Sequence, residues 1–149
     1  MNWRSTLGLG LLLLLVTGCT GSPREVNVAI DKTQENLLHI GHAYSRYLDS
    51  AKRPPTSADQ LKPYLKEFGN PDELFRSTRD GEPFVICWGV DLSAPPAWAA
   101  PGSTPVIAYE KRGSEGQRYV LTTMGNAMLL TDADFSTASF PPGHKRPGG

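Results

Sequence analysis

A helical repeat of apolar residues, stopped by two prolines, most constrains what this chain can fold into. Apolar residues recur three and four positions apart, the spacing of one face of an α-helix, at Leu37, Ile40, Gly41, Tyr44, Leu48 and Ala51. Pro54 and Pro55 follow, and the residue before a proline avoids helical backbone angles. The sequence therefore predicts one amphipathic helix that ends near Arg53 and needs a surface to cover its apolar face.

The residues at the start of this helix and its one glycine lead to two further predictions. Asp31, with Gln34 three residues later, predicts a capping box at the first turn, and residues 26–30 offer an alternative extension of the helix. Gly41 lies within the apolar face, where the lack of a side chain lets another element approach closely. The alternative interpretation is a tolerated glycine with no packing role.

A second, shorter helix is expected over residues 57–69. Ser57 followed by Gln60 predicts another capping box, and apolar residues again have helical spacing at Leu61, Tyr64, Leu65 and Phe68. Pro63 lies inside this stretch and removes one backbone donor. The sequence therefore predicts either one helix or two turns that meet at a kink.

After Pro71 the pattern changes from helical to strand-like. Residues 84–90 are apolar on both faces and predict a central strand that follows a turn at Asp80 and Gly81. Residues 91–105 contain four prolines and no period, which predicts an irregular surface loop. Further strands are expected at 106–110, 118–123 and 127–131.

The short links between these strands favour an antiparallel meander. The glycine-rich residues 112–116 join two strands and do not lead into a helix, so they predict a hairpin loop and not a phosphate site. The expected fold is a single α+β domain in two layers. A long N-terminal helix packs on a three- to four-stranded antiparallel meander, because helix and sheet each have an apolar face to bury.

An apolar run near the N-terminus ends close to a cysteine. A helix that crosses a bilayer needs roughly 20 apolar residues, and residues 7–16 are too few to span one. Arg4 before the run and small residues after it match the layout of a secretory signal. The stretch from Val16 to Cys19 resembles the lipobox of bacterial lipoproteins. This resemblance implies cleavage before Cys19, acylation of its thiol and a lipid anchor in a membrane of the cell envelope.

Lipoprotein processing would divide the chain into four parts: signal peptide 1–18, lipidated cysteine and tether 19–25, domain 26–140, and a flexible tail 141–149 with little apolar content to pack. Two or more acyl chains hold a protein firmly on a membrane. By the sorting rule of enteric lipoproteins, Thr20 implies the outer membrane, so we expect the outer membrane or the periplasmic face. The alternative is an ordinary cleaved signal with a chance cysteine.

The order of the expected elements resembles the globular domains of type IV pilins and type II secretion pseudopilins. LLHIGHAYSRYL, RPPTSADQLKPYL and the stretch from RDGEPFVICWG to YVLTTMGNAMLLTD carry this resemblance, which covers residues 26–135. It implies a pilin-like domain, with a lipid anchor in place of the long apolar helix that pilins pack into filaments. Some pseudopilins bind calcium near the end of the sheet, which suggests Asp132 and Asp134. Two carboxylates fall short of the six to eight oxygens that calcium takes, so we expect no metal site.

No set of residues predicts catalysis or a cofactor. Cys87 lies in an apolar stretch and is expected to be a buried small side chain without a disulfide partner once Cys19 is acylated. His39, His42 and Arg46 point away from the apolar helix face and predict a solvated polar surface, and His144 lies in the tail. Basic and acidic residues number 15 each, so no basic surface favours nucleic-acid binding.

Trp98 is the candidate contact residue. It lies in the loop 91–105, where an aromatic side chain is either held against the sheet or offered to a partner. We therefore expect a membrane-anchored envelope lipoprotein that acts without catalysis, as a scaffold or a protein-interaction module. The alternative is a lipoprotein that binds a small ligand or a polysaccharide through this loop. A third possibility is a hydrolase whose residues converge only in three dimensions.

Overall fold

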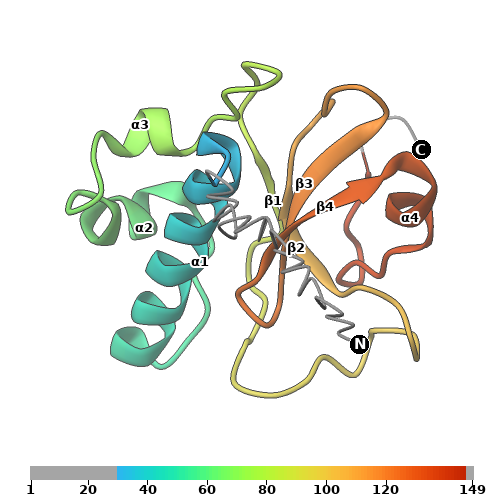
Figure 1. Cartoon of the computed structure of the whole chain (residues 1–149). Coiled ribbons are helices and arrows are strands. Elements are labelled where there is room, and N and C mark those ends of the chain that lie inside the picture. Colours follow the sequence, from blue (N-terminus) through green and yellow to red (C-terminus); the bar gives the residue numbers. More distant parts are fainter. Residues whose placement is uncertain (1–29, 147–149) are drawn as a thin grey trace, which may run out of the picture.

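A four-stranded antiparallel sheet forms the centre of the structure, a computed structural model that describes residues 30–146 (Figure 1). The strands follow in the order β1 (Val85–Ile86), β2 (Val106–Tyr109), β3 (Gln117–Thr122) and β4 (Ala127–Thr131). Helices α1 (Lys32–Ala51), α2 (Ala58–Leu65) and α3 (Pro71–Leu74) lie on one side, and α4 (Asp132–Thr137) lies on the other. The expected α+β class, with a long helix followed by an antiparallel sheet, is confirmed.

Helix α1 begins as the sequence predicts, but without the capping box. The Asp31 side chain accepts a hydrogen bond from the Thr33 backbone N–H at 2.7 Å. Gln34 does not turn back to the cap, because its side-chain amide donates to the Ala127 carbonyl of β4 at 2.8 Å. Ile30 precedes the helix, and the alternative extension through residues 26–29 lies outside the described residues.

The apolar face of α1 packs on the sheet at Gly41. A Cβ atom at Gly41 would lie 3.0 Å from the Leu121 Cδ1 atom of β3, so the expected close approach is confirmed. Leu37, Ile40 and Tyr44 are fully buried around this contact. The apolar stripe then becomes exposed, because α1 continues past the sheet until Lys52 adopts a left-handed conformation with φ of 55° and ends it.

Helices α2 and α3 differ from the sequence prediction in their caps and number. Ser57 makes no side-chain cap hydrogen bond, and the Gln60 side chain instead accepts from the Thr56 backbone N–H at 2.7 Å. Pro63 lies inside α2. The prediction that helical structure stops at Pro71 was wrong, because a proline suits the first position of a helix and the Asn70 side chain caps this one.

The stretch 84–90 is not a central strand. Only Val85 and Ile86 join the sheet, and they form its edge opposite Tyr109 and Ala108 of β2. Of the remaining apolar side chains of this stretch, Phe84, Cys87 and Val90 are buried among the helices and loops on the α1 side, and Trp88 is partly buried there. A continuous apolar run indicates burial on both sides, but it does not by itself distinguish a strand from an irregular buried segment.

Strands β2 to β4 form the predicted meander. Strand β4 has the predicted bounds, and β3 pairs with it from Gln117 opposite Thr131 to Leu121 opposite Ala127. The hairpin loop between β2 and β3 needs Gly113, which has a φ of 72° and where a Cβ atom would lie 2.3 Å from the Gln117 carbonyl oxygen. Residues 112–116 are therefore a hairpin loop, as predicted.

A second hydrophobic cluster covers the opposite face of the sheet, so the two-layer expectation was wrong. Successive side chains of a strand point to opposite faces. Leu121 and Ala127 face α1, whereas Val120 and Leu130 pack with Phe135 of α4. Helix α4 was not predicted because it spans only six residues.

The segment after α4 packs against this second cluster, which corrects the prediction of a flexible tail for residues 141–146. The Tyr109 hydroxyl and the His144 Nε2 atom are 2.9 Å apart, and the His144 ring stacks on Phe140. Arg146 donates to the Ser136 carbonyl at 3.0 Å. Aromatic and polar contacts hold this segment in place. The prediction of a flexible tail considered only its low apolar content and so did not include these contacts. Residues 147–149 lie outside the described range.

A buried carboxylate joins three separate segments of the fold. Glu110, directly after β2, has no exposed surface. Its side chain accepts hydrogen bonds from the Ser77 hydroxyl at 2.5 Å, the Arg79 guanidinium at 3.0 Å and the Tyr119 backbone N–H at 2.7 Å. Each carboxylate oxygen therefore has a donor, as a buried charge requires. This network positions the turn after α3 against the sheet.

Candidate binding surface

Residues 91–96 of the proline-rich loop border three surface depressions, and we call this segment the 91–96 ridge. The helix groove lies between the ridge and the C-terminal half of α1 and has a volume of about 410 Å³. The tryptophan groove, also about 410 Å³, lies on the side of Trp88 and Trp98. The methionine groove, about 400 Å³, lies toward Met124. Three depressions of the described surface thus share this one segment.

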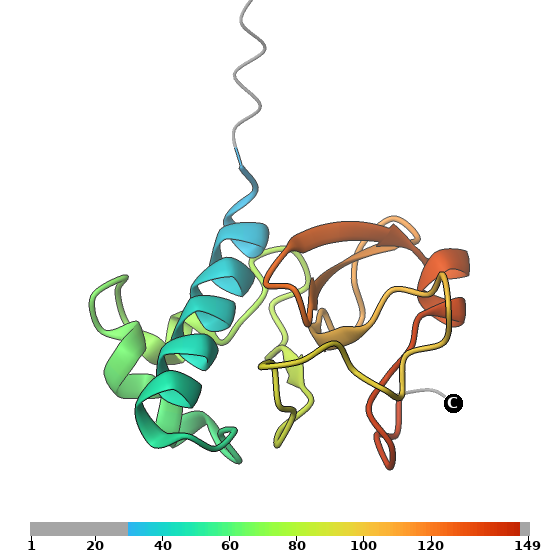
Figure 2. The same cartoon turned by 90° about the horizontal axis from the view of Figure 1, so that it is seen from below.

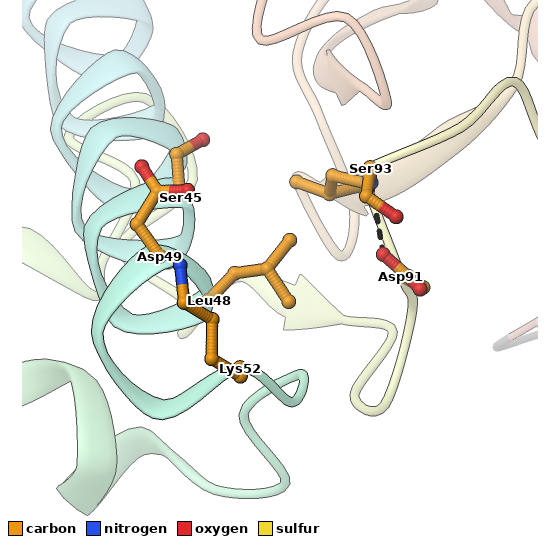
Figure 3. Close-up of a pocket in the computed structure, with 7 residues that line it drawn as sticks. Ser45, Leu48, Asp49, Lys52, Asp91 and Ser93 are labelled. Carbon is orange, nitrogen blue, oxygen red and sulfur yellow. Dashed lines mark hydrogen bonds between the residues drawn. The ribbon is translucent and has the colours of Figure 1, made fainter.

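The helix groove has an apolar floor between polar walls (Figure 3). Leu48 and Asp49 line it on the α1 side and Asp91 on the loop side, and Leu92 of the ridge is a further lining residue. The Asp91 carboxylate accepts a hydrogen bond from the Ser93 backbone N–H at 2.8 Å. Hydrogen bonding from Ser93 lowers the pKa of Asp91, so this carboxylate is charged at neutral pH.

The tryptophan groove contains the residue that the sequence singled out. Trp98 is half-buried against the main hydrophobic core and also lines this groove with Trp88. It is therefore partly held in place and partly available to a ligand. Pro141 and Pro142 form the far wall, and Asp91 contributes to this groove as well as to the helix groove. Two aromatic rings and one carboxylate thus lie around the same depression.

The methionine groove is the most apolar of the three. Pro95, Pro96 and Pro105 line it together with Met124, whose side chain is 82% exposed at the tip of the turn between β3 and β4. Exposed large apolar side chains beside a depression mark candidate contact surfaces. The sequence analysis did not single out Met124, because it lies in a short link between two predicted strands.

Buried hydrogen bonds hold the two residues that precede the ridge, Gly89 and Val90. The Tyr44 hydroxyl donates to the Val90 carbonyl at 3.0 Å and accepts from the Val90 N–H at 2.9 Å. The Gly89 N–H donates to the Pro55 carbonyl at 2.8 Å. Burial raises the pKa of Tyr44 to about 12, so the hydroxyl keeps its proton at neutral pH.

Ser139 holds the other end of the proline-rich loop. Its hydroxyl accepts a hydrogen bond from the Ala100 N–H at 3.0 Å and lies 2.5 Å from the Ser103 hydroxyl. The Val106 N–H donates to the Ser139 carbonyl at 2.9 Å, which joins the loop to the sheet. A loop without regular structure is thus attached at both ends, and the ridge is a preformed surface.

The predicted solvated polar surface is confirmed for His42 and Arg46, which are exposed, whereas His39 is partly covered by Phe68. His39 stacks on Phe68 with ring centroids 4.1 Å apart, and His42 meets the same ring edge-on. Arg46 pairs with Glu67 close by. The segment after α2 folds back over this side of α1, a tertiary contact that helical periodicity does not reveal.

Asp132 and Asp134 lie in the first turn of α4 and have protein partners there. Asp132 pairs with Arg118 at 3.0 Å, and Asp134 accepts a hydrogen bond from the Thr131 hydroxyl at 2.7 Å. Among residues 30–146 no group of three or more histidine, cysteine, aspartate or glutamate side chains is placed to hold a metal. The two aspartates stabilise a helix end, where negative charge is favourable.

Cys87 is buried, as predicted. Burial raises the pKa of its thiol to about 12, which keeps it protonated and unreactive at neutral pH. Cys19, the candidate lipid attachment residue, lies outside the described residues. Within residues 30–146, no helix combines the length and apolar character that a membrane crossing requires.

Similarity to known proteins was sought at three levels. Comparisons with protein-family models, with curated proteins and with solved structures found no match for this chain.

Proposed function

We propose that this chain is a lipid-anchored envelope protein whose domain acts without catalysis as a protein-interaction module or scaffold. Cys19 carries the acyl chains, and the 91–96 ridge with its three grooves contacts the partner. The support for the anchor is the sequence up to Cys19, where a charged start, a short apolar run and a lipobox-like stretch occur in the right order. The outer membrane or the periplasmic face is the proposed location.

The observation that carries this proposal is the direction of α1. The described chain enters the domain at Ile30, beside the first turn of α1, whereas the helix groove lies at the last turns (Figure 2). A helix of 20 residues is about 30 Å long. A tether at Ile30 therefore leaves the helix groove at the opposite end of α1, where a partner reaches it without meeting the membrane.

The chemistry of the ridge favours a protein partner. Hydrogen bonds hold both ends of the loop that carries its prolines and apolar side chains. The backbone of the ridge therefore loses little conformational entropy when a partner binds. Exposed Met124 and half-buried Trp98 supply apolar contact area, and Asp49 and Asp91 supply charge for specificity.

A pilin-like character of the domain belongs to the same proposal. Its support is the order of a long N-terminal helix followed by an antiparallel meander of neighbouring strands. Pilin-like domains act through protein contacts, which agrees with an interaction module. A lipid anchor at Cys19 would hold such a domain at the membrane without filament packing through a long apolar helix.

Site-specific photo-crosslinking in cells tests the partner surface. A photoreactive amino acid in place of Pro95 is expected to trap a defined envelope protein, whereas the same group in place of exposed Lys66 at the end of α2 is not. Equal crosslinking from both positions would contradict a partner at the ridge. Metabolic labelling with a fatty-acid probe tests the anchor, and Cys19→Ser is expected to abolish the label.

A second candidate function is the binding of an envelope polysaccharide or a small ligand in the tryptophan groove. The observation in its favour is the placement of Trp88 and Trp98 around one depression with the Asp91 carboxylate. Aromatic faces stack on apolar sugar faces, and a carboxylate accepts hydrogen bonds from hydroxyl groups. This candidate shares the anchor but replaces the protein partner with a glycan.

A further inference from the structure

The outer edge of β4 presents backbone hydrogen-bonding groups at its centre. The Thr122 N–H donates to the Asn126 carbonyl at 3.0 Å, at the turn where β4 begins. Hydrogen-bonded pairs alternate along an antiparallel ladder, so Met128 and Leu130 also direct their backbone groups toward β3. The N–H and carbonyl of Leu129 therefore point to the opposite edge, where the described part of the chain supplies no further strand.

The two ends of this edge are already engaged. At the first residue of β4, the Ala127 carbonyl accepts a hydrogen bond from the Gln34 side chain of α1 at 2.8 Å. At the last residue, the Thr131 side chain caps α4, and the chain leaves the sheet. Between them, Leu129 is 40% exposed. An open strand edge with an apolar side chain is a template for one more strand.

The described chain begins beside this edge. Asp31 caps α1 with an extended backbone, ψ 137°, so the helix does not continue through it toward Ile30. Burial raises the pKa of Tyr119, and the nearby Asp31 carboxylate raises it further. Tyr119 is the residue of β3 that pairs with Leu129. The chain therefore enters the domain close to the level of Leu129, and Figure 2 shows the start of α1 beside β4.

The sequence of residues 26–30 suits such an edge. These residues, VNVAI, place a β-branched side chain at every second position. This is the period of a strand with one apolar face, and valine and isoleucine are favoured in strands. The segment is joined to the domain at its own end, so its local concentration at β4 is on the order of 1 mM. This proximity favours it over a second copy of the chain as the occupant of the edge.

We propose that residues 26–30 add to the edge of β4 as a fifth, antiparallel strand, with Val28 opposite Leu129. In this register the Val28 N–H donates to the Leu129 carbonyl, and the Leu129 N–H donates to the Val28 carbonyl. Side chains directly opposite each other share a face of the sheet, so Val28 covers Leu129 on the α1 side. The inference concerns the domain alone and does not depend on acylation of Cys19.

A fifth strand also changes the length of the proposed tether. Residues 20–25 then separate Cys19 from the sheet, and six residues span at most about 20 Å when extended. A tether that continued to Ile30 would add four residues and span at most about 35 Å. The added strand therefore holds the domain closer to its point of attachment, and it protects the edge of β4 from pairing with other chains.

Amide hydrogen exchange tests the pairing in the full chain with Cys19→Ser, which removes acylation as a variable. We expect the Leu129 amide to be protected. Val28→Pro removes the N–H that faces β4 and is expected to speed exchange of the Leu129 amide about tenfold. Asn27→Pro is the matched control, because the N–H of Asn27 faces away from β4, where an edge strand tolerates proline. It is expected to leave Leu129 protected.

Three other results would overturn the proposal. The first is a Leu129 amide that exchanges freely in the parent protein, or that both prolines accelerate equally. The second is protection of Leu129 that is lost on dilution, which would show that a second copy covers the edge. The third is a set of helical chemical shifts at Val28, which would show that this segment forms a helix.

A pair of cysteines tests the register independently. Ala29 lies directly opposite Met128 in the proposed strand, in a pair whose Cα atoms are about 4.5 Å apart, within disulfide range. In the Cys19→Ser background the remaining natural thiol, Cys87, is buried. With oxidised glutathione, Ala29→Cys with Met128→Cys is expected to form an intramolecular disulfide about tenfold faster than Val28→Cys with Met128→Cys, whose side chains point to opposite faces. Equal rates, measured by peptide mass spectrometry, would overturn the proposed strand.

Discussion

Arg79 and Glu110 form an ion pair of 3.0 Å in which the carboxylate is wholly buried. The same carboxylate binds the Ser77 hydroxyl and the Tyr119 N–H, and the Arg79 guanidinium also donates to the Ser114 carbonyl. One pair thus fixes the turn after α3, the end of β2 and the hairpin before β3. Removal of either side chain would leave the other one charged and without its ion-pair partner beside the core.

We expect Glu110→Gln to lower the free energy of unfolding by about 3 kcal/mol, because breaking a buried pair leaves Arg79 without its charge partner. Urea denaturation measures this change. Lys111→Gln, which removes the exposed partner of Glu82 at 3.3 Å, is the control and is expected to cost less than about 1 kcal/mol. Equal losses in the two variants would contradict a structural role for the buried pair.

The contact between Gly41 and Leu121 predicts different results for a small and a branched side chain. In Gly41→Ala the new Cβ atom meets the flexible end of Leu121 at 3.0 Å, and a gain in helix propensity of about 1 kcal/mol offsets this strain. The stability is therefore expected to change little. Gly41→Val adds two methyl groups in the same place and is expected to destabilise by about 2 kcal/mol. Thermal unfolding measures the stability of both variants. Equal stability of the valine and alanine variants would contradict the close contact between Gly41 and Leu121.

Tyr44→Phe is expected to loosen the start of the ridge. The change leaves the Val90 N–H and carbonyl without their buried hydrogen-bond partner, which costs about 1–3 kcal/mol. Amide hydrogen exchange at Val90 should become faster than in the unchanged protein. Tyr47→Phe alters a half-buried ring on the same helix and is expected to leave the Val90 amide protected.

The stability of the domain is expected to fall at alkaline pH. Burial raises the pKa of Cys87 from 9.0 to about 12, and that of Tyr44 and Tyr109 from 10.0 to about 12. The unfolded chain loses these protons at lower pH than the folded chain, so deprotonation favours unfolding. The stabilising effect is complete below pH 9.0 and is lost as the pH rises toward about 12. Urea midpoints measured across this range test the prediction.

Cys87→Ala separates the thiol from the tyrosines in that experiment. The variant lowers stability at neutral pH because it removes buried volume, but its decline is expected to begin nearer pH 10.0, the ordinary pKa of tyrosine. In the unchanged protein, the Cys87 thiol should not react with a disulfide reagent at neutral pH until the chain is unfolded. Rapid reaction of the folded protein would show that Cys87 is not buried.

Trp98→Ala tests the glycan alternative. Tryptophan fluorescence of the unlipidated Cys19→Ser protein, titrated with cell-wall oligosaccharides, is expected to change if sugar stacks in the tryptophan groove. Trp98→Phe keeps an aromatic face and should retain part of the binding, whereas Trp98→Ala should weaken it by up to about tenfold, since aromatic contacts of this kind contribute up to about 1.5 kcal/mol. A titration without response in the unchanged protein would favour the protein partner.

The local features of the fold could be predicted from the sequence. Helix α1, its end before two prolines, and strand β4 follow from apolar periods and backbone preferences that act within a few residues. Gly41 was recognised as a close contact because it interrupts a row of large side chains. The loop 91–105 and Trp98 were identified because prolines exclude regular structure there.

The candidate site required long-range contacts that no local pattern contains. Asp49 and Asp91 face a common groove only because α1 ends beside the loop after β1. His144 was assigned to a flexible tail, and a single hydrogen bond to Tyr109 with aromatic stacking places it against the sheet. Such pairings depend on residues far apart in the chain.

The sequence by itself predicted the long helix, the second helix and the order of the last three strands, because these depend on neighbouring residues. It also suggested the anchor at Cys19, which stays a prediction. Tertiary structure alone decided that only Val85 and Ile86 of residues 84–90 join the sheet, at its edge, that Glu110 is buried with Arg79, and that both sheet faces are covered. The physical reason is that burial depends on which surfaces meet. A run of apolar residues predicts that the segment will be buried, but only the folded chain shows which element buries it.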